Sequence, residues 1–257
     1  MTAATGKKEK IIYRRPTSWK GAYTHYCPGC SHGVINKMIC EVIDELGIQE
    51  KTIGVAPVGC SVLIYNYLDV DFVEAPHGRA PAVATGISRT RPDKVVFAYQ
   101  GDGDLASIGT AEIIHAANRG ENVAIVFINN AIYGMTGGQM APTTLMEQVT
   151  TTTPYGRSAG NSGYPIRVSE MLATLTTPAY IERCSASGFK HLQTLKRALT
   201  KAFRNQLEGK GFSLVEVLAT CPTNWGMAPL AAEKWLEEHM MPYFPLGKFK
   251  DFDGEAK

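Results

Sequence analysis

The sequence has no long hydrophobic run and little excess charge of either sign. No apolar run among its 257 residues approaches the roughly 20 residues that a helix needs to span a bilayer. The formal net charge is only +2, so nothing indicates binding to nucleic acid or to a membrane surface. The chain begins with polar and charged residues rather than with the apolar core of a signal peptide. We therefore expect a cytoplasmic protein with no nucleic-acid or membrane partner.

Cysteine is scarce as well. Six cysteines are too few for a disulfide scaffold in a chain of this length, and a reducing compartment disfavours structural disulfides. Metal binding, catalysis or burial must therefore explain them. Hydrophobic residues make up 44% of the chain, which is enough for one large domain or two small ones.

Apolar segments typical of buried strands alternate with helical segments along most of the chain. Strands are expected near residues 51–58, 71–75, 94–100, 122–130, 179–183 and 212–221, and helices near 31–46, 79–88, 104–119, 169–173, 192–205 and 231–240. This alternation predicts an α/β fold with a mostly parallel sheet flanked by helices. We expect an N-terminal arm at 1–22, a core domain at 23–229, and a C-terminal helix and arm at 230–257.

Two local features qualify this pattern. Ser31 is placed to cap the first helix and Gly47 to end it. Residues 134–165 are rich in glycine, threonine and proline and show little periodicity. A long segment of this kind within a compact domain is usually functional or disordered.

The turn that follows the strand at 94–100 resembles a phosphate-binding loop. Residues 101–106 read GDGDLA and match the dinucleotide pattern G-x-G-x-x-A, which is weak evidence alone. A dinucleotide site also needs an acid at the end of the next strand. That strand ends in Asn129 and Asn130, and the nearest acid, Glu121, comes before the strand.

Magnesium and a diphosphate explain both strand ends better. Asp102 and Asn130 each follow a strand, and the carboxyl ends of parallel strands open onto the same crevice. Oxygen ligands with room for water and phosphate suit Mg²⁺. The glycines allow the backbone to approach a diphosphate, whose charge is favoured at the start of a helix. The sequence therefore predicts a Mg²⁺-diphosphate site.

The motif CPGC places Cys27 and Cys30 three residues apart. Such a pair can be a disulfide, a redox dithiol, half of a zinc site or half of an iron–sulfur site. Cys60 and Cys221 each lie just beyond a strand, where the fold can bring further ligands. The ligands alone do not choose between zinc and an iron–sulfur cluster. Cys40 and Cys184 belong to no motif, and we expect them to be inert buried groups.

The spacing of GDG and NN, from Gly101 to Asn130, resembles the signature of thiamine diphosphate enzymes. The resemblance implies their thiamine-diphosphate-binding fold, with thiamine diphosphate and Mg²⁺ as cofactors. In that family the Asp, the final Asn and a backbone carbonyl two residues further on hold the Mg²⁺. The corresponding residues here are Asp102, Asn130 and Ile132.

The motifs CPGC, VGCS and ATCPTN, with HGRA at 77–80 and YGMTGGQMAPTT at 133–144, resemble one branch of that family. This branch is the β subunit of the 2-oxoacid:ferredoxin oxidoreductases. The resemblance implies a [4Fe–4S] cluster on Cys27, Cys30, Cys60 and Cys221. It also implies a set of residues that bind the organic cofactor: Gly59, Cys60, Ser61, His77, Gly101, Gly103, Asp104, Asn130, Tyr133, Gly134, Met135 and Thr136. Beside the cluster motif, His32 either caps the helix or faces the cluster.

The resemblance also implies an activity and partners. The expected reaction is the oxidative decarboxylation of a 2-oxoacid with coenzyme A, which gives acyl-CoA, CO₂ and reduced ferredoxin. The glutamate that activates thiamine diphosphate comes from the partner α subunit in this family, and no acid here matches it. We expect an inactive isolated chain, an active site at a subunit interface, and further γ and ferredoxin-like δ subunits.

The substrate is less sharply indicated. The segment from Pro222 onwards resembles the branched-chain members that act on 3-methyl-2-oxobutanoate. Some relatives that accept 2-oxoglutarate carry a lysine where this chain has Gly137, and a cation there would suit a distal carboxylate. A 2-oxoglutarate enzyme is the alternative, because a partner chain could supply the cation. A hypothesis of another class is a non-catalytic, zinc-stabilised nucleotide-binding module.

Overall fold

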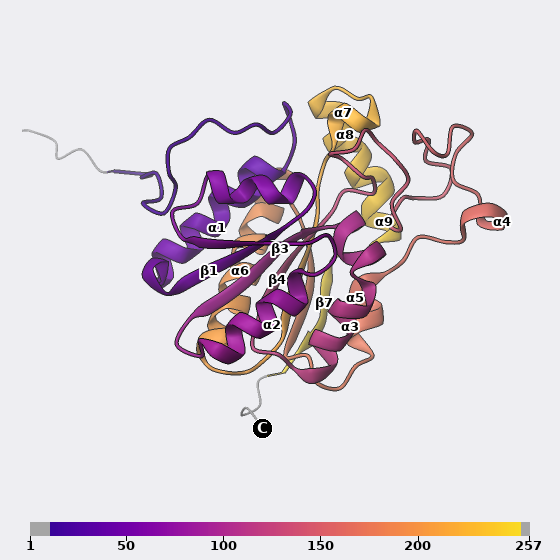
Figure 1. Ribbon diagram of the computed structural model, residues 1–257. Coiled ribbons are helices and arrows are strands. Elements are labelled where there is room, and N and C mark those ends of the chain that lie inside the picture. The colour runs from indigo at the N-terminus through magenta and orange to yellow at the C-terminus, as the bar shows by residue number, and fades with distance from the viewer. Residues whose placement is uncertain (1–10, 253–257) are drawn as a thin grey trace, which may run out of the picture.

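The computed structural model describes residues 11–252, which form a sheet with helices on both faces (Figure 1). The first ten residues of the expected N-terminal arm and the last five residues of the chain lie outside the described residues. Between residues 11 and 252, no helix is both long enough and apolar enough to cross a membrane.

The seven strands of the sheet lie in the order β2-β1-β3-β4-β6-β5-β7. Neighbouring strands are parallel except for β7, which pairs antiparallel with β5. The strands are β1 (Thr52–Pro57), β2 (Asp71–Ala75), β3 (Val95–Gly101), β4 (Ala124–Asn129), β5 (Tyr180–Ser185), β6 (Ser213–Leu218) and β7 (Gly247–Asp251). The predicted mostly parallel sheet is confirmed, and the carboxyl ends of its parallel strands meet at one edge.

Helices pack on both faces of the sheet (Figure 1). One face carries α1 (His32–Leu46) and α6 (Gly188–Leu207), and the other carries α2 (Ala80–Thr90), α3 (Thr110–Arg119) and α5 (Val168–Ala173). The other elements are short: η1 (Gln49–Lys51), η2 (Cys60–Asn66), η3 (Asp104–Ile108), α4 (Ala159–Ser162), α7 (Pro222–Trp225), α8 (Pro229–Trp235), η4 (Leu236–Met240) and α9 (Met241–Tyr243).

The central strands alternate between two cores because successive side chains of a strand point to opposite faces. In β3, Phe97 and Tyr99 join the core beneath α1 and α6, whereas Val96 and Ala98 join the core beneath α2 and α3. Every residue of β4 is buried. A strand that is buried on both sides belongs in the middle of a covered parallel sheet, which explains its nearly continuous apolar sequence.

Three local features differ from the sequence-based expectation. Ser31 precedes α1 but makes no capping hydrogen bond, so the predicted cap is wrong. Its hydroxyl instead accepts the backbone N–H of Thr220 at 2.9 Å, which ties the start of α1 to the end of β6. Cys184 lies within β5 rather than after the strand. The C-terminal segment adds the edge strand β7 to the sheet, where the sequence indicated only an arm.

The segment 134–166 is held in one conformation by a buried arginine. Arg157 is only 4% exposed. Its guanidinium donates hydrogen bonds to the backbone carbonyls of Ala141, Pro142, Thr144, Ser162, Gly163 and Tyr164. Because these carbonyls come from both ends of the segment, one side chain joins the two ends. Apart from the short helix α4, the segment is therefore held by this side chain rather than by a long helix or a strand.

Candidate cofactor and metal site

A pocket lies at the carboxyl edge of the sheet, beside the ends of β1, β3 and β4. Its lining residues are His32, Val58, Gly59, Cys60, Ser61, His77, Gly101, Asp102, Gly103, Asp104, Asn130, Ile132, Tyr133, Gly134, Met135 and Thr136. The structure thus brings together every residue that the sequence predicts for the diphosphate cofactor and for Mg²⁺. It adds two lining residues, Val58 and His32.

Asp102 lies at the floor of this pocket and is 2% exposed. One carboxylate oxygen accepts the backbone N–H of Gly103 at 2.9 Å, and the other accepts the hydroxyl of Thr143 at 2.6 Å. Burial raises the pKa of this carboxyl to about 6, and hydrogen bonds, including those from the Ala131 and Asn130 backbone, lower it less. A cation beside the carboxylate would stabilise its charged form.

Two buried oxygen atoms in the pocket have no partner within the described part of the chain. These are Oδ1 of Asn130 and Oγ of Ser61. A buried polar atom is normally hydrogen-bonded, so each is explained best by a bound group. An amide oxygen suits Mg²⁺, and a hydroxyl can donate to a phosphate oxygen. The residues present therefore fit a Mg²⁺-diphosphate.

The turn after β3 is shaped by close approaches of the backbone. A Cβ on Gly103 would lie 2.1 Å from the Tyr133 ring, so only glycine fits there. Asp104 accepts the N–H of Gly78 and the side-chain amide of Gln100, both at 2.6 Å. Because both of its oxygens are occupied, Asp104 shapes the turn more than it faces a ligand.

His77 reaches the same turn from the loop before α2. Its Nε2 lies 3.4 Å from the carbonyl oxygen of Gly103, and its Nδ1 lies 3.8 Å from Asp104. The side chain is 31% exposed, so it borders the mouth of the pocket rather than its floor. This position is compatible with its predicted role as a donor to the diphosphate, which stays a prediction.

The four predicted cluster cysteines come from three separate segments that meet beside the pocket. The backbone N–H of Thr220 donates to the Ser31 hydroxyl at 2.9 Å, and the Thr220 hydroxyl donates to the carbonyl of Gly29 at 2.7 Å. These two hydrogen bonds fasten the CPGC loop next to Cys221. A Cβ on Gly134 would lie 3.2 Å from Sγ of Cys60 and 3.8 Å from Sγ of Cys221. Both sulfurs therefore contact the wall of the pocket.

Burial favours the protonated form of three of these thiols, Cys30, Cys60 and Cys221, when no metal is bound. Burial, with smaller contributions from neighbouring cysteines, raises the pKa of Cys30 to about 12 and that of Cys60 to about 11. Burial also raises the pKa of Cys221, although the side-chain amide of Asn224 lowers it by donating to the sulfur at 3.3 Å. Metal binding at this site would have to displace protons from the thiols.

The spacing of the sulfurs bears on the choice of metal. Within residues 11–252, no three or more His, Cys, Asp or Glu side chains lie close enough together to hold one metal ion. A zinc ion would draw four sulfurs to about 2.3 Å from a single centre. A [4Fe–4S] cluster would also be held by four cysteine thiolates, so the choice between zinc and a cluster stays a prediction.

The two remaining cysteines lie away from this site. Cys40 is fully buried in α1, and its thiol donates to the carbonyl of Ser18 at 3.6 Å. Cys184 is buried in the core beneath α6. Their burial agrees with the expectation that both are inert.

The sequence analysis missed several residues that shape the pocket. Thr143 binds Asp102, Gln100 binds Asp104, and the indole N–H of Trp225 donates to the carbonyl of Asn130 at 3.1 Å. All three are ordinary polar or aromatic residues outside any motif that names their role. Only the fold brings Thr143 and Trp225 to the strand ends, so no local signal could have found them.

His32 connects the pocket with the core. Its Nδ1 lies 2.6 Å from the hydroxyl of Tyr99, and its ring stacks on Tyr26 at a centroid distance of 4.9 Å. Burial lowers the pKa of this imidazole to about 4, so it is neutral near pH 7. The side chain lines the pocket and caps no helix.

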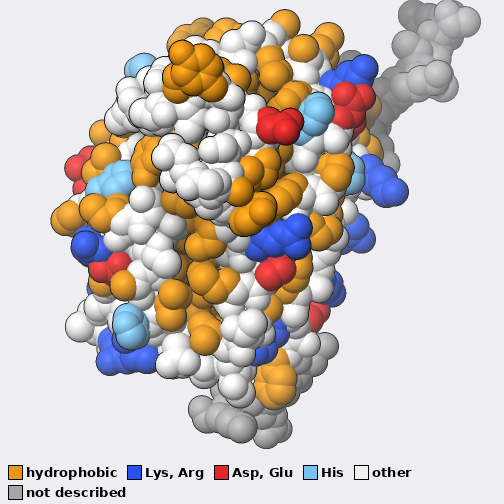
Figure 2. Space-filling model, turned by 90° about the vertical axis from the view of Figure 1, so that its right-hand side faces the viewer, with side chains coloured by type: hydrophobic (Ala, Val, Ile, Leu, Met, Phe, Trp, Pro, Cys, Tyr) orange, Lys and Arg blue, Asp and Glu red, His pale blue; other side chains and the backbone are white. Residues whose placement is uncertain are grey.

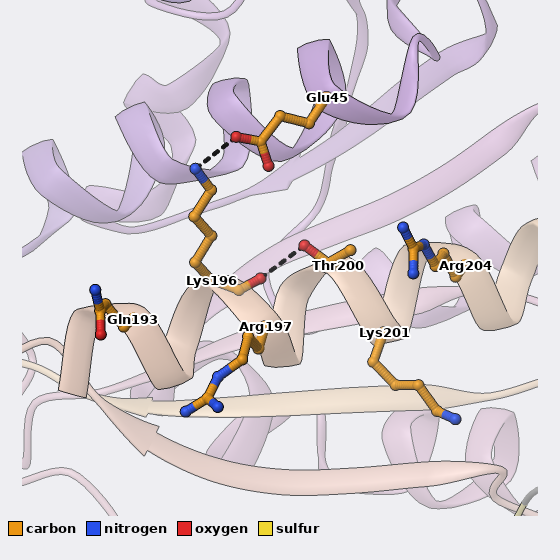
Figure 3. Close-up of a pocket in the computed structure, with 7 residues that line it drawn as sticks. All are labelled: Glu45, Gln193, Lys196, Arg197, Thr200, Lys201 and Arg204. Atoms are coloured by element: carbon orange, nitrogen blue, oxygen red, sulfur yellow. Dashed lines mark hydrogen bonds and ion pairs between the residues drawn. The ribbon is translucent and has the colours of Figure 1, made fainter. Parts of the chain in front are cut away.

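A second pocket lies between α1 and α6 (Figure 3). It is lined by Glu45, Gln193, Lys196, Arg197, Thr200, Lys201 and Arg204. Figure 3 shows Lys196 pointing to Glu45, while Arg197 and Lys201 point away from it. Lys196 pairs with Glu45 at 2.7 Å and with Glu41 at 3.0 Å. Since Glu45 lies at the far end of α1 from the cysteines, about 20 Å along the helix, this pocket is separate from the predicted chemistry.

Comparison with known proteins defines the class of this fold and site. Residues 57–217 match the family model of the thiamine pyrophosphate enzymes, C-terminal TPP binding domain. The match covers more than half of the chain and includes both strand ends of the predicted magnesium site. The chain belongs to the thiamine pyrophosphate enzymes, within the branch of the 2-oxoacid:ferredoxin oxidoreductases.

The relatives and a solved structure support that branch. The chain is 52% identical over 258 residues to the ketoisovalerate oxidoreductase subunit VorA of Methanothermobacter thermautotrophicus, which covers 96% of this chain and 54% of that one. It is 37% identical to the 2-oxoglutarate synthase subunit KorB of Methanocaldococcus jannaschii, over 90% of this chain and 82% of that one. The chain thus spans about half the length of the ketoisovalerate oxidoreductase subunits that it matches.

The fold is similar to that of a solved 2-oxoglutarate:ferredoxin oxidoreductase from Magnetococcus marinus, which contains 2-oxoglutarate, coenzyme A and succinyl-CoA. The TM-score is 0.76 at 27% sequence identity, and the match covers 96% of this chain and 88% of that one. The predicted thiamine-diphosphate-binding fold is therefore confirmed.

Proposed function

We propose that this chain is the β subunit of a 2-oxoacid:ferredoxin oxidoreductase, which oxidatively decarboxylates a 2-oxoacid with coenzyme A to acyl-CoA, CO₂ and reduced ferredoxin. One observation carries the proposal. Cys60 lines the cofactor pocket and also lies beside Cys221 at Gly134. The pocket and the cysteine site therefore share a wall, which suits an enzyme in which electrons pass from one to the other.

The pocket and the neighbouring cysteines would hold two different groups. Bound thiamine diphosphate would supply cleavage of the carbon–carbon bond beside a carbonyl, and a [4Fe–4S] cluster would supply one-electron transfer. Asp102, Asn130 and the carbonyl of Ile132 would hold Mg²⁺, and Ser61 would donate to the diphosphate. Cys27, Cys30, Cys60 and Cys221 would hold the cluster.

The preferred substrate is 3-methyl-2-oxobutanoate, the branched-chain 2-oxoacid. The relatives named for ketoisovalerate are more similar to this chain than those named for 2-oxoglutarate. None of the described residues that line the pocket is lysine or arginine, so none of them would offer such a side chain to a second carboxylate. Gly137 has a φ of 106°, which side chains rarely adopt, and this disfavours a lysine there. An oxidoreductase for 2-oxoglutarate is the alternative.

A partner subunit would complete the active site. None of the described glutamates lines the pocket, so the activating acid would come from the α subunit. The loop beside the pocket exposes apolar side chains suited to such an interface: Met135, Val149, Tyr155 and Tyr164. Figure 2 shows many hydrophobic side chains, among white side-chain and backbone atoms, on the side of the molecule that carries α4. The γ and ferredoxin-like δ subunits, the acceptor ferredoxin and the cytoplasmic location belong to the same proposal.

Turnover by the anaerobically assembled complex tests the substrate. We expect CoA-dependent reduction of a viologen dye to be fastest with 3-methyl-2-oxobutanoate, slower with 2-oxoglutarate and with pyruvate, and absent with the isolated chain. A preference for 2-oxoglutarate would favour the alternative. Activity of the isolated chain would contradict the shared active site, and zinc without iron in the protein would favour the zinc-stabilised module.

A further inference from the structure

A row of buried polar side chains crosses the sheet next to residues 130–132. We call these residues the magnesium turn, because they carry two of the predicted magnesium ligands. Asn129 ends β4, Glu216 lies on the adjacent β6, and Arg183 lies directly opposite Glu216 on β5. All three are at most 1% exposed. They share the face covered by α5, where the neighbouring positions of the same strands are apolar. The row therefore runs through a hydrophobic core rather than along its border.

At the β4 end of the row, Asn129 fixes the turn that carries Asn130. The side-chain N–H of Asn129 donates to Oε1 of Glu216 at 2.8 Å, and its Oδ1 accepts the backbone N–H of Ala131 at 3.3 Å. Because a carboxylate only accepts, Glu216 decides which way the Asn129 amide faces. Ala131 has a φ of 58°, a left-handed conformation that is unfavourable for a residue with a Cβ. The turn thus needs a partner to hold it.

This strained turn lies between two of the predicted magnesium ligands. The turn sets where Oδ1 of Asn130 and the carbonyl of Ile132 point, since these residues flank Ala131 on either side. Asn130 and Ile132 both line the pocket, whereas Asn129 does not. Asn129 and Glu216 can therefore influence a bound ion only through the conformation of the turn.

At the β5 end of the row, Arg183 and Glu216 have further polar partners. Nε of Arg183 lies 2.8 Å from Oε2 of Glu216 in an ion pair whose N–H does not point squarely at the oxygen. The hydroxyl of Ser169 donates to the same Glu216 oxygen. Arg183 also binds Glu170 on α5, and its guanidinium lies 4.9 Å from the centre of the Phe249 ring on β7. Both carboxylate oxygens of Glu216 therefore have partners on other elements.

Stability alone does not account for such a row. Desolvation of two buried charges often costs as much as their attraction returns, and apolar residues of similar volume frequently serve as well. What the row provides is orientation, because Glu216 contacts both Arg183 and Asn129.

We propose that Glu216 is a positioning residue for the magnesium turn, which acts through Asn129 to hold Asn130 and Ile132 in the geometry that binds Mg²⁺. This inference rests on the proposed function, since it assumes a Mg²⁺-diphosphate in the pocket. Groups behind metal ligands typically change metal affinity 10- to 100-fold when they are removed.

The test compares Glu216→Gln with Glu170→Gln in the anaerobically purified complex. Glu170→Gln weakens the other ion pair of Arg183 but leaves Asn129 untouched. Equilibrium dialysis gives the Mg²⁺ concentration that half-saturates retention of thiamine diphosphate. We expect Glu216→Gln to raise that concentration at least tenfold and Glu170→Gln to leave it within twofold, even where both lower the melting temperature.

Asn129→Ala provides a second route to the same result if Glu216→Gln does not fold. It should raise the half-saturating Mg²⁺ concentration by a similar factor. The double variant Glu216→Gln/Asn129→Ala should bind Mg²⁺ no more weakly than either single variant, because both substitutions break the same Glu216–Asn129 hydrogen bond. Ala131→Gly, which removes the strain at this φ, should restore most of the affinity in the Asn129→Ala protein. A merely structural role for the row would not give this rescue.

The outcomes separate the inference from the proposed function. If the wild-type complex retains no thiamine diphosphate at any Mg²⁺ concentration, the proposed function fails. If the wild type retains it and both Glu216→Gln and Asn129→Ala behave like Glu170→Gln, the positioning role is wrong and the proposed function stands.

Discussion

The hydroxyl of Thr143 donates a 2.6 Å hydrogen bond to Oδ2 of Asp102, across 41 residues of sequence. Thr143 is fully buried and belongs to the loop that Arg157 holds in place. The loop after the magnesium turn therefore folds back onto Asp102 and orients its carboxylate. The site is built by this loop as much as by the strand ends.

Removal of the Thr143 hydroxyl should weaken Mg²⁺ binding while the fold remains. Thr143→Val keeps the shape of the side chain but leaves Oδ2 of Asp102 without its donor. We expect the Mg²⁺ concentration that half-saturates retention of thiamine diphosphate to rise about tenfold. Thr143→Ser keeps the hydroxyl and should stay within about twofold of wild type. Equal behaviour of the two variants would show that the hydrogen bond does not matter.

Asp102 should make the metal-free chain less stable as the pH rises. Burial raises its pKa from 3.8 to about 6, so the folded chain favours the protonated form. The stabilisation is complete below about pH 4 and is lost as the pH rises through 6. Asp102→Asn removes this dependence and should gain on wild type by on the order of 3 kcal/mol between pH 4 and pH 7.

Thermal melting of both proteins across this pH range, without Mg²⁺ and without thiamine diphosphate, measures that difference. Added Mg²⁺ and cofactor should then stabilise the wild type more than Asp102→Asn, because the substitution removes the negative charge that would attract the ion. A difference that stays constant with pH would mean that Asp102 titrates at an ordinary value.

The cysteines should divide into four that matter for the cluster and two that do not. Cys221→Ser removes the ligand most distant in the sequence and should abolish or degrade the broad absorption near ~400 nm that thiolate-ligated iron–sulfur groups give. Cys40→Ser changes a buried thiol away from the pocket and should retain both the absorption and the iron. Full iron content in Cys221→Ser would exclude that residue as a ligand.

Arg157 should be needed for the order of the loop between residues 134 and 166. Arg157→Leu leaves several buried carbonyls without a donor, and we expect a loss of about 3 kcal/mol and faster proteolytic cleavage within the loop. Arg167→Leu is the matched control, since Arg167 is exposed and lies over the Tyr243 ring, at 4.7 Å. Cleavage of both variants at the wild-type rate would contradict the role of Arg157.

The parts of the site that follow from local sequence patterns were predictable. Asp102 and Asn130 directly follow strands whose apolar runs are unmistakable, and the topology of a parallel sheet then brings them to one crevice. The CPGC motif and the helix after it were predictable in the same way, since both depend on neighbouring residues.

The parts that depend on distant contacts were not predictable. Ser31 looks like a helix cap, but the N–H of Thr220, which follows β6, takes its hydroxyl. Strand β7 is formed by the sequence GKFKD, whose strand character is weak and becomes sufficient only beside β5. The segment 134–165 shows little periodicity because its one helix, α4, is short and the buried guanidinium of Arg157 binds several of its carbonyls.

We propose that one chain holds both thiamine diphosphate and a [4Fe–4S] cluster. The two groups would lie on opposite sides of the pocket wall at Gly134. The most direct measurement is a crystal structure of the anaerobically purified complex with anomalous data collected at the iron edge. We predict iron density bound by Cys27, Cys30, Cys60 and Cys221, with Mg²⁺ on Asp102 and Asn130. Zinc at these cysteines, or iron bound only by partner subunits, would contradict the account.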